Sequence, residues 1–180
     1  MLSMRYLVAV LFLLFFSCRN INIDKELVLI DSLEYIIVDA EKQLGDVDIE
    51  TLKNTKKKVN ADLEVLKEYF NDSLEWDLAK FLDGYNLINK SMGKYIKTHS
   101  YLKVELEYSK TQLANLRNDI SKNILSVDSF NVYIKVEALA IEELATTINN
   151  KVPMVKNNIS RYKESKPRIK EILLQIAENS

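Results

Sequence analysis

The stretch VPMVKNNISRYKESKPRIKEILLQI, residues 152–176, carries the most regular hydrophobic pattern of the chain. Its positions spaced by three and four residues are Val152, Val155, Ile159, Tyr162, Lys166, Ile169, Leu173 and Ile176. This spacing places one lysine and seven apolar side chains on a single face of an α-helix, as in a helix that packs against other helices. Pro167 falls inside the pattern without shifting its register, which predicts one kinked helix rather than two independent ones.

Five earlier segments share this spacing and predict further helices. They are residues 24–44, 49–70, 74–88, 102–124 and 130–148. The expected separators are Gly45, residues 71–73, Gly93, residues 126–129 and the sequence NNKVP at 149–153. Three glycines and two prolines in 180 residues argue against a turn-rich β fold. The sequence therefore predicts an all-α fold, an elongated antiparallel bundle of about five or six helices.

The N-terminal segment MLSMRYLVAVLFLLFFSC, residues 1–18, differs in character from the rest. One basic residue, Arg5, precedes the uncharged run Tyr6–Phe16, and Ser17 precedes Cys18, the only cysteine. An apolar run of this length is typical of a secretory signal peptide. It is shorter than the roughly 20 residues that a helix needs to cross a bilayer.

These residues resemble the signal peptide of a bacterial lipoprotein, in which an aliphatic residue, a spacer and a small residue precede the cysteine. Phe15 stands where leucine is commonest in that family. The resemblance implies that residues 1–17 are removed between Ser17 and Cys18, and that Cys18 is acylated. It thereby implies a protein of the cell envelope, anchored by lipid to the periplasmic or outer surface of a bacterial membrane. An uncleaved signal anchor and cleavage at another bond, leaving a free thiol, are the alternatives.

After such cleavage, residues 18–23 form a short tether and residues 24–180 form the bundle domain. Residues 19–23 reach at most about 17 Å, which keeps the first helix near the headgroups. The mature chain carries 24 basic and 26 acidic side chains. Nucleic-acid binding requires clustered Lys and Arg to neutralise phosphates, so the near-neutral balance predicts no nucleic-acid partner. A single cysteine excludes an internal disulfide.

Residue types that carry catalysis or bind metals are scarce. His99, the only histidine, lacks a second ligand at a suitable spacing and is interpreted as a helix-start or core-edge residue. Asp46, Asp48 and Glu50 alternate as in a calcium loop but lack its glycine and its final glutamate. Acids at a helix N-terminus stabilise its partial positive charge, which is the favoured interpretation. We therefore predict no metal, no cofactor and no catalytic residues.

Two basic runs and two acidic pairs are the other charged features. The runs, at residues 53–58 and 163–170, would suit anionic lipid headgroups. Acids interspersed on the same helices favour a solvated helix face instead. Glu105 with Glu107, and Glu142 with Glu143, have no basic partner that the sequence reveals.

Aromatic residues are dense in the middle third of the chain. Aromatics at helical spacing usually belong to a core, whereas an exposed aromatic patch marks a binding surface. The candidate partner surface consists of Trp76, Phe81, Tyr85, Tyr95 and Tyr101.

The favoured function is a non-catalytic binding or structural role toward a protein partner at the membrane surface. The alternatives are an envelope carrier of a small apolar ligand and an enzyme on the same bundle. A closed cavity lined by Tyr85, Met92 and Tyr95 would favour these alternatives. A packed core with an exposed apolar stripe would favour the binding role.

Overall fold

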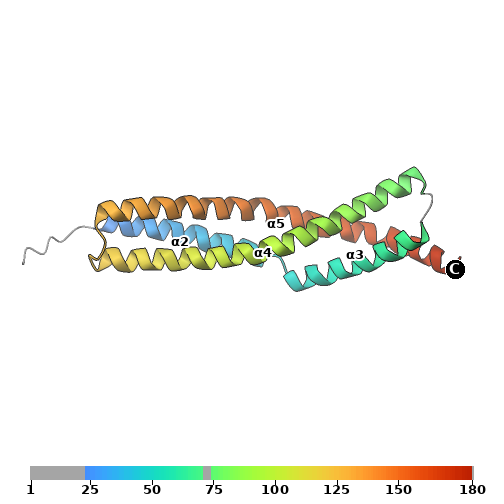
Figure 1. Ribbon diagram of the computed structural model, residues 1–180, viewed down its shortest axis with the longest axis horizontal. Coiled ribbons are helices and arrows are strands. Elements are labelled where there is room, and N and C mark those ends of the chain that lie inside the picture. Colours follow the sequence, from blue (N-terminus) through green and yellow to red (C-terminus); the bar gives the residue numbers. More distant parts are fainter. Residues whose placement is uncertain (1–22, 71–73, 180) are drawn as a thin grey trace, which may run out of the picture.

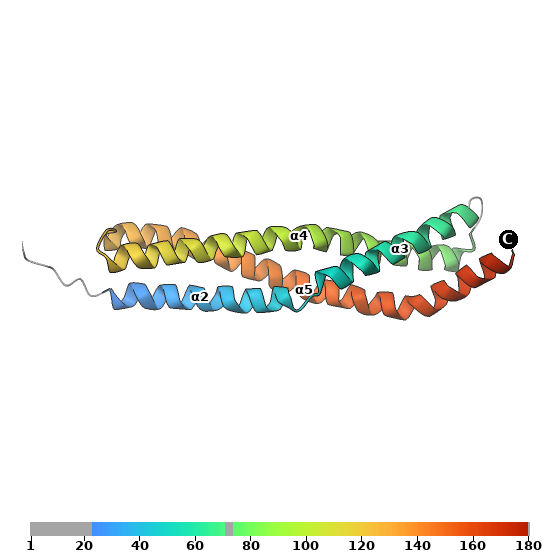
Figure 2. The same ribbon diagram turned by 90° about the horizontal axis from the view of Figure 1, so that it is seen from below.

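The computed structural model describes residues 23–70 and 74–179, which form an elongated bundle of four helices (Figure 1). The helices are α2 (Asp24–Gly45), α3 (Ile49–Tyr69), α4 (Trp76–Ser121) and α5 (Val127–Glu178). Figures 1 and 2 show α3 continuing in the direction of α2, α4 returning along both, and α5 running back again. The bundle thus has three long arms, and α2 and α3 together make up the first.

The prediction of an all-α antiparallel bundle is confirmed, but five or six helices are too many. The segments expected at 74–88 and 102–124 both belong to α4, which spans 46 residues. Gly84 and Gly93 lie inside α4, and no glycine among the described residues has a positive φ. Because α4 contains no proline, every backbone N–H within it remains available for the helical hydrogen bonds.

The predicted break at NNKVP is also wrong, since Pro153 and Pro167 both lie inside α5, which spans 52 residues. A proline frees the carbonyl four residues earlier, here those of Asn149 and Lys163. Both of these residues are exposed, so water can donate a hydrogen bond to each freed carbonyl. Figure 2 shows that α5 bends along its length. Pro167 therefore lies in one continuous helix, as its unbroken register predicts.

One apolar core extends along the whole bundle. α2 packs against α4 and α5 in one half, α3 packs against the same two helices in the other half, and the described residues of α2 and α3 do not contact each other. Every cross-section therefore contains three helices. The buried positions of α2 reproduce its predicted apolar face: Ile30, Leu33, Ile37, Ala40 and Leu44.

Local sequence explains where the helices start. The Asp48 carboxylate accepts hydrogen bonds from the backbone N–H of Glu50 and Thr51, at 3.0 and 3.1 Å, and so caps α3. This confirms that an acid in this cluster serves the helix N-terminus. Asp46 pairs with Lys156 at 2.9 Å, which joins the α2–α3 connection to α5. Ser126 caps α5 by accepting from the N–H of Ser129.

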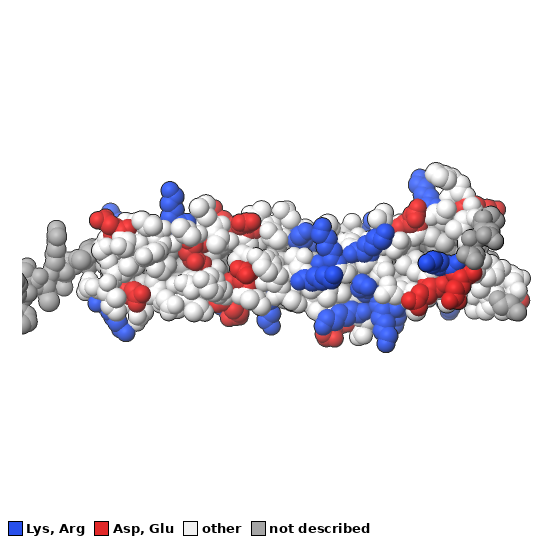
Figure 3. Space-filling view, in the orientation of Figure 1, with Lys and Arg blue, Asp and Glu red and all other residues white. Residues whose placement is uncertain are grey.

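Charged side chains are not spread evenly along the bundle. Figure 3 shows that Lys and Arg gather over the first half of α3 and the middle of α4 on this face, while Asp and Glu lie mainly toward both ends.

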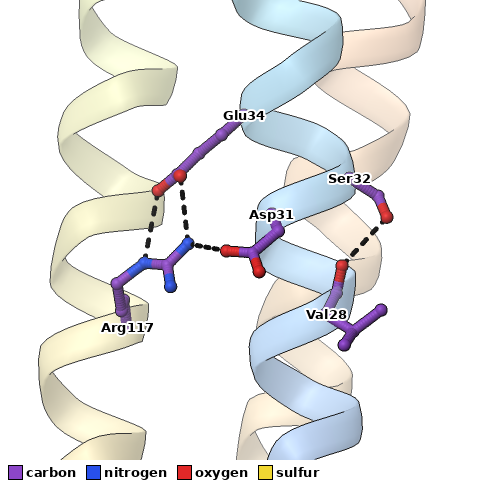
Figure 4. A network of polar contacts seen from close by, with 5 residues as sticks. All are labelled: Val28, Asp31, Ser32, Glu34 and Arg117. Carbon is purple, nitrogen blue, oxygen red and sulfur yellow. Dashed lines mark hydrogen bonds and ion pairs between the residues drawn. The ribbon is translucent and has the colours of Figure 1, made fainter.

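An ion-pair network joins α2 to α4 near one end of the bundle (Figure 4). The guanidinium of Arg117 donates to both carboxylate oxygens of Glu34, at 3.3 and 3.0 Å, and also to Asp31. Such a forked contact fixes the register of the two helices as well as adding attraction. The Ser32 hydroxyl donates to the carbonyl of Val28 within α2. Lys110 pairs with Glu41 at 2.6 Å, which repeats the α2–α4 connection farther along.

Candidate functional site

The structure divides the five aromatic residues that were predicted to form a partner surface. Trp76 is 78% exposed at the start of α4, and Tyr101 is 59% exposed. Phe81 is half-buried beneath the guanidinium of Arg168, whose central carbon lies 4.3 Å from the ring centroid. Tyr85 and Tyr95 are only 1% exposed. These two are therefore core residues rather than surface residues, because they point into the three-helix interior. The predicted lipid-attachment site at Ser17 and Cys18 lies outside the described residues.

The two buried tyrosines differ in their polar contacts. The Tyr85 hydroxyl donates to Asp62 of α3 at 2.8 Å, and its ring stacks on Tyr162 of α5 with centroids 6.3 Å apart. The Tyr95 hydroxyl is buried with no hydrogen-bond partner among the described residues. Burial is the main cause that raises the pKa of both hydroxyls, and it raises that of Tyr95 to about 12. Met92 between them is fully buried, so this part of the interior is packed by side chains.

An exposed apolar face lies on the half of the bundle formed by α2, α4 and α5. On α4 it consists of Tyr101, Val104 and Tyr108, which are 59%, 65% and 59% exposed. Their spacing of three and four residues puts them on one side of the helix. Four exposed apolar side chains also occur on α5: Val132, Tyr133, Val136 and Leu139. We call Tyr101, Val104, Tyr108 and these α5 residues the tyrosine face.

A groove of about 220 Å³ between α4 and α5 adjoins this face. Tyr101 and Tyr108 line it from α4, and Ala140 and Leu144 line it from α5. Three carboxylates line the same groove: Glu105, Glu137 and Glu143. The groove therefore combines apolar and aromatic surface with a negatively charged margin.

One of these carboxylates is incompletely hydrogen-bonded. The Oε1 atom of Glu137 is buried and has no hydrogen-bond partner among the described residues. A buried carboxylate oxygen without a donor is costly, and a donor supplied from outside would remove this cost. The arrangement suits a segment that brings apolar side chains together with a Lys or Arg.

His99 lies inside α4 rather than at a helix start. It is half-buried, with its ring centroid 6.0 Å from that of Tyr95. Burial, and then the positive charge of Lys103, lower the pKa of His99. Among the described residues, no group of three or more His, Cys, Asp or Glu side chains is placed to hold a metal ion. Within the same residues, no helix combines the length and the apolar character that crossing a bilayer requires.

Comparison with known proteins finds no matching family model, no matching curated protein and no matching solved structure.

The predicted partner surface included Tyr101 but left out Tyr108 and Val104, and the sequence did not predict that Glu105, Glu137 and Glu143 line one groove beside it. The separate acidic pairs at 105/107 and 142/143 were the available signal. They supply Glu105 and Glu143 to one groove only because α4 and α5 pack antiparallel, which brings residues far apart in sequence together.

Proposed function

We propose that this chain is a lipid-anchored protein of the bacterial cell envelope whose bundle binds a protein partner at the membrane surface without catalysis. The tyrosine face is the observation that carries the proposal. Isolated exposed apolar residues are common, whereas Tyr101, Val104 and Tyr108 share one side of α4, and two of them line a groove with apolar walls, as is typical of an interaction site. Tyrosine is also enriched at protein interfaces, because it offers a large apolar ring with a polar tip.

The chemistry of the groove indicates the kind of partner. Glu105, Glu137 and Glu143 line the groove between α4 and α5, together with apolar side chains. A basic amphipathic helix laid along this groove would bury its apolar face on Tyr101 and Tyr108 and direct Lys or Arg side chains to the carboxylates. At any level, the described residues 23–70 and 74–179 place three helices side by side, so the partner helix would lie beside them as a fourth.

The resemblance of residues 1–18 to a lipoprotein signal peptide supports the anchor. In Figure 1, the start of α2 and the α4–α5 connection lie at the same end of the bundle. Tyr108 lies 13 residues before the end of α4, about 20 Å along the helix at 1.5 Å per residue. A chain anchored through Cys18 would therefore present the tyrosine face within reach of other proteins of the same membrane.

The packing of Tyr85, Met92 and Tyr95 supports binding over catalysis or ligand transport. These side chains are 1%, 0% and 1% exposed, and they belong to the continuous core. The arrangement expected of a binding bundle is such a core together with an exposed apolar stripe on the outside.

The anchor is tested by the intact mass of protein extracted from membranes, compared with a Cys18→Ala variant. We expect the mass of residues 18–180 plus acyl chains, and loss of both the acyl chains and the membrane fraction in Cys18→Ala. An unmodified chain with unchanged fractionation in the variant would refute the anchor.

The binding face is tested separately by photo-crosslinking in intact cells, with a benzophenone amino acid at position 108. Position 35 serves as the matched control, because Tyr35 is 75% exposed but lies on α2. We expect one discrete protein adduct from position 108 and none from position 35. The yield should fall when Glu137 and Glu143 are replaced by Gln. The same adduct from both positions, or none from 108, would contradict the proposal.

A further inference from the structure

Three segments in the middle of the bundle contain no acidic residue. They are residues 51–61 of α3, 84–104 of α4 and 144–163 of α5. Together they contain twelve of the 25 Lys and Arg residues of the chain, whereas all 26 Asp and Glu residues lie outside them. The net charge of −1 for the whole chain therefore conceals a strong separation of charge along it.

The fold places these three segments side by side. The Nδ2 of Asn89 in α4 donates to the Oδ1 of Asn60 in α3 at 2.6 Å. The Nδ2 of Asn158 in α5 donates to the Oγ of Ser91 in α4 at 2.7 Å. Acid-free segments of three helices thus meet at one level and form a basic belt around the bundle. Part of this belt is the concentration of Lys and Arg that Figure 3 shows.

An open groove of about 580 Å³ lies within the belt between α3 and α4. Lys56 lines it from α3, and Lys90, Lys94 and Lys97 line it from α4. The three α4 lysines are exposed, and their spacing of four and three residues forms a row about 10 Å long on one side of the helix. We call this surface the lysine groove.

The positive charge of the lysine groove is not neutralised by the protein itself. No ion pair within the described residues involves Lys56, Lys90, Lys94 or Lys97. No carboxylate is among the residues that line the groove. Uncompensated charges in a concave site raise the local concentration of an oppositely charged ligand.

Two residues that line the groove, Asn89 and Gly93, shape the packing of α3 against α4. Gly93 lets the Lys56 side chain cross α4 closely, since a Cβ at position 93 would lie 2.8 Å from the Cε of Lys56. Asn89 is nine-tenths buried and joins α4 to α3 through Asn60. The amide oxygen of Asn89 has no hydrogen-bond partner among the described residues. This oxygen is itself buried, so Asn89 serves the packing of α4 against α3.

We propose that the lysine groove binds a linear acidic polysaccharide that lies along the bundle axis. Lysines on both walls surround an extended chain from two sides, whereas a flat bilayer would not enter a groove. The lining contains no aromatic ring on which a nucleotide base could stack. Lysine acts as a point charge rather than as a planar fork, so the groove responds to charge density rather than to one fixed anion geometry.

This inference is independent of the tyrosine face and of the lipid anchor. The lysine groove lies between α3 and α4, in the half of the bundle that contains α3. The tyrosine face lies in the half that contains α2. The 22 residues of α2 separate the start of the bundle from the belt by about 33 Å. The two surfaces are therefore able to hold different partners at the same time.

The test measures binding of the full chain in detergent to size-fractionated dextran sulfate, with neutral dextran of the same size as the control ligand. Four lysine contacts predict that affinity falls on the order of 100-fold between roughly 50 and 200 mM salt, by release of counterions. The triple variant Lys90→Gln, Lys94→Gln, Lys97→Gln should bind more weakly and reduce this salt effect to a few-fold. Glutamine keeps the helix propensity of lysine, and circular dichroism verifies the fold.

A second triple variant controls for net charge alone. Lys25→Gln, Lys122→Gln and Lys135→Gln remove the same charge from exposed positions outside the belt, and the affinity and salt dependence should remain those of the wild type. Equal losses in both triple variants, or wild-type binding that salt does not weaken, would overturn the proposal. Tighter binding of an oligo(dT) strand or of phosphatidylglycerol vesicles than of dextran sulfate would overturn the choice of polysaccharide.

Discussion

Tyr85 and Tyr95 provide a sharp test of the packed core, because they are equally buried and differ in one contact. Each is replaced by phenylalanine, which keeps the ring and removes only the hydroxyl. In Tyr85 this removes the donor of a 2.8 Å hydrogen bond to Asp62. In Tyr95 it removes a buried hydroxyl that has no partner among the described residues. The two substitutions should therefore change stability in opposite directions.

The expected magnitudes follow from the cost of an unmade hydrogen bond. Leaving a buried polar group unpaired costs about 1–3 kcal/mol, so Tyr95→Phe should raise the free energy of unfolding by about 1 kcal/mol or more. A hydrogen bond to a charged group contributes about 1.5–3 kcal/mol. Tyr85→Phe should therefore lower the free energy of unfolding by about 2 kcal/mol, and it also leaves Asp62 without this donor.

Alkaline pH gives a second measurement of the same groups. Burial raises the pKa of Tyr95 to about 12 and also raises that of Tyr85, from the ordinary value of 10.0. Between these values the folded chain keeps protons that the unfolded chain has released. Stability from this source is complete below pH 10 and is lost as the pH rises toward 12. Tyr95→Phe should weaken this alkaline loss.

Urea titrations followed by circular dichroism measure both effects, at neutral pH and from pH 9 upward. Tyr69→Phe is the control, because Tyr69 is 45% exposed, and it should change neither quantity. Destabilisation by Tyr95→Phe equal to that by Tyr85→Phe would refute the assignment of an unpaired hydroxyl. No effect of either substitution would show that the two hydroxyls are not buried as described.

Three further substitutions test the helices themselves. Phe130→Ala, at a position of α5 that is 0% exposed, should lower the free energy of unfolding by about 3–5 kcal/mol in urea, while exposed Val132→Ala should change it by less than about 0.5 kcal/mol. Asp48→Ala should lower the melting temperature at neutral pH and Asp48→Asn should not, since asparagine also caps helices. Hydrogen bonds from Thr51, first from its side chain and then from its backbone N–H, lower the pKa of Asp48 below 3.8. The difference in melting temperature between the wild type and Asp48→Ala should therefore shrink as acid protonates the wild-type carboxylate. Pro167→Ala should raise the free energy of unfolding by up to about 3 kcal/mol; a decrease would show that the bundle requires the bend.

Hydrophobic spacing predicted the helical positions of this fold better than it predicted where the helices end. The face of α2 from Ile30 to Leu44 is buried as its spacing requires. The error was to treat Gly93 and Pro153 as breaks. Both residues disfavour an isolated helix, but each contributes only a few kcal/mol. Packing along helices of 46 and 52 residues exceeds such local costs, and the sequence around one glycine or proline does not contain that information.

The aromatic residues show the same limit for the candidate site. Spacing along α4 alone could not separate Tyr95 from Tyr101, because both lie in a helix that has one side covered and one side open. Burial depends on which neighbours α4 acquires, and α3 and α5 are far from it in sequence. The groove beside Tyr101 and Tyr108 emerges only when α4 and α5 pair antiparallel, which brings residues near 101–109 and 137–147 together.

The surroundings of the basic belt also depend on how the helices pack. The lysines at 53–58 belong to a helix that also contains Asp62 and Glu64. The sequence alone therefore favoured a solvated helix face. Across the bundle, Lys56 lines one groove with Lys90, Lys94 and Lys97, and the nearest acids on α4, Asp83 and Glu105, lie about two helical turns from this row. Charge repulsion at this level opposes folding, and compensating lysines with acids on the adjacent helix would have removed that cost. Two of the twelve belt charges are paired with acids, Lys53 with Glu50 and Lys156 with Asp46. The four lysines of the groove have no such pair among the described residues, and an anionic ligand supplies the compensation that they lack.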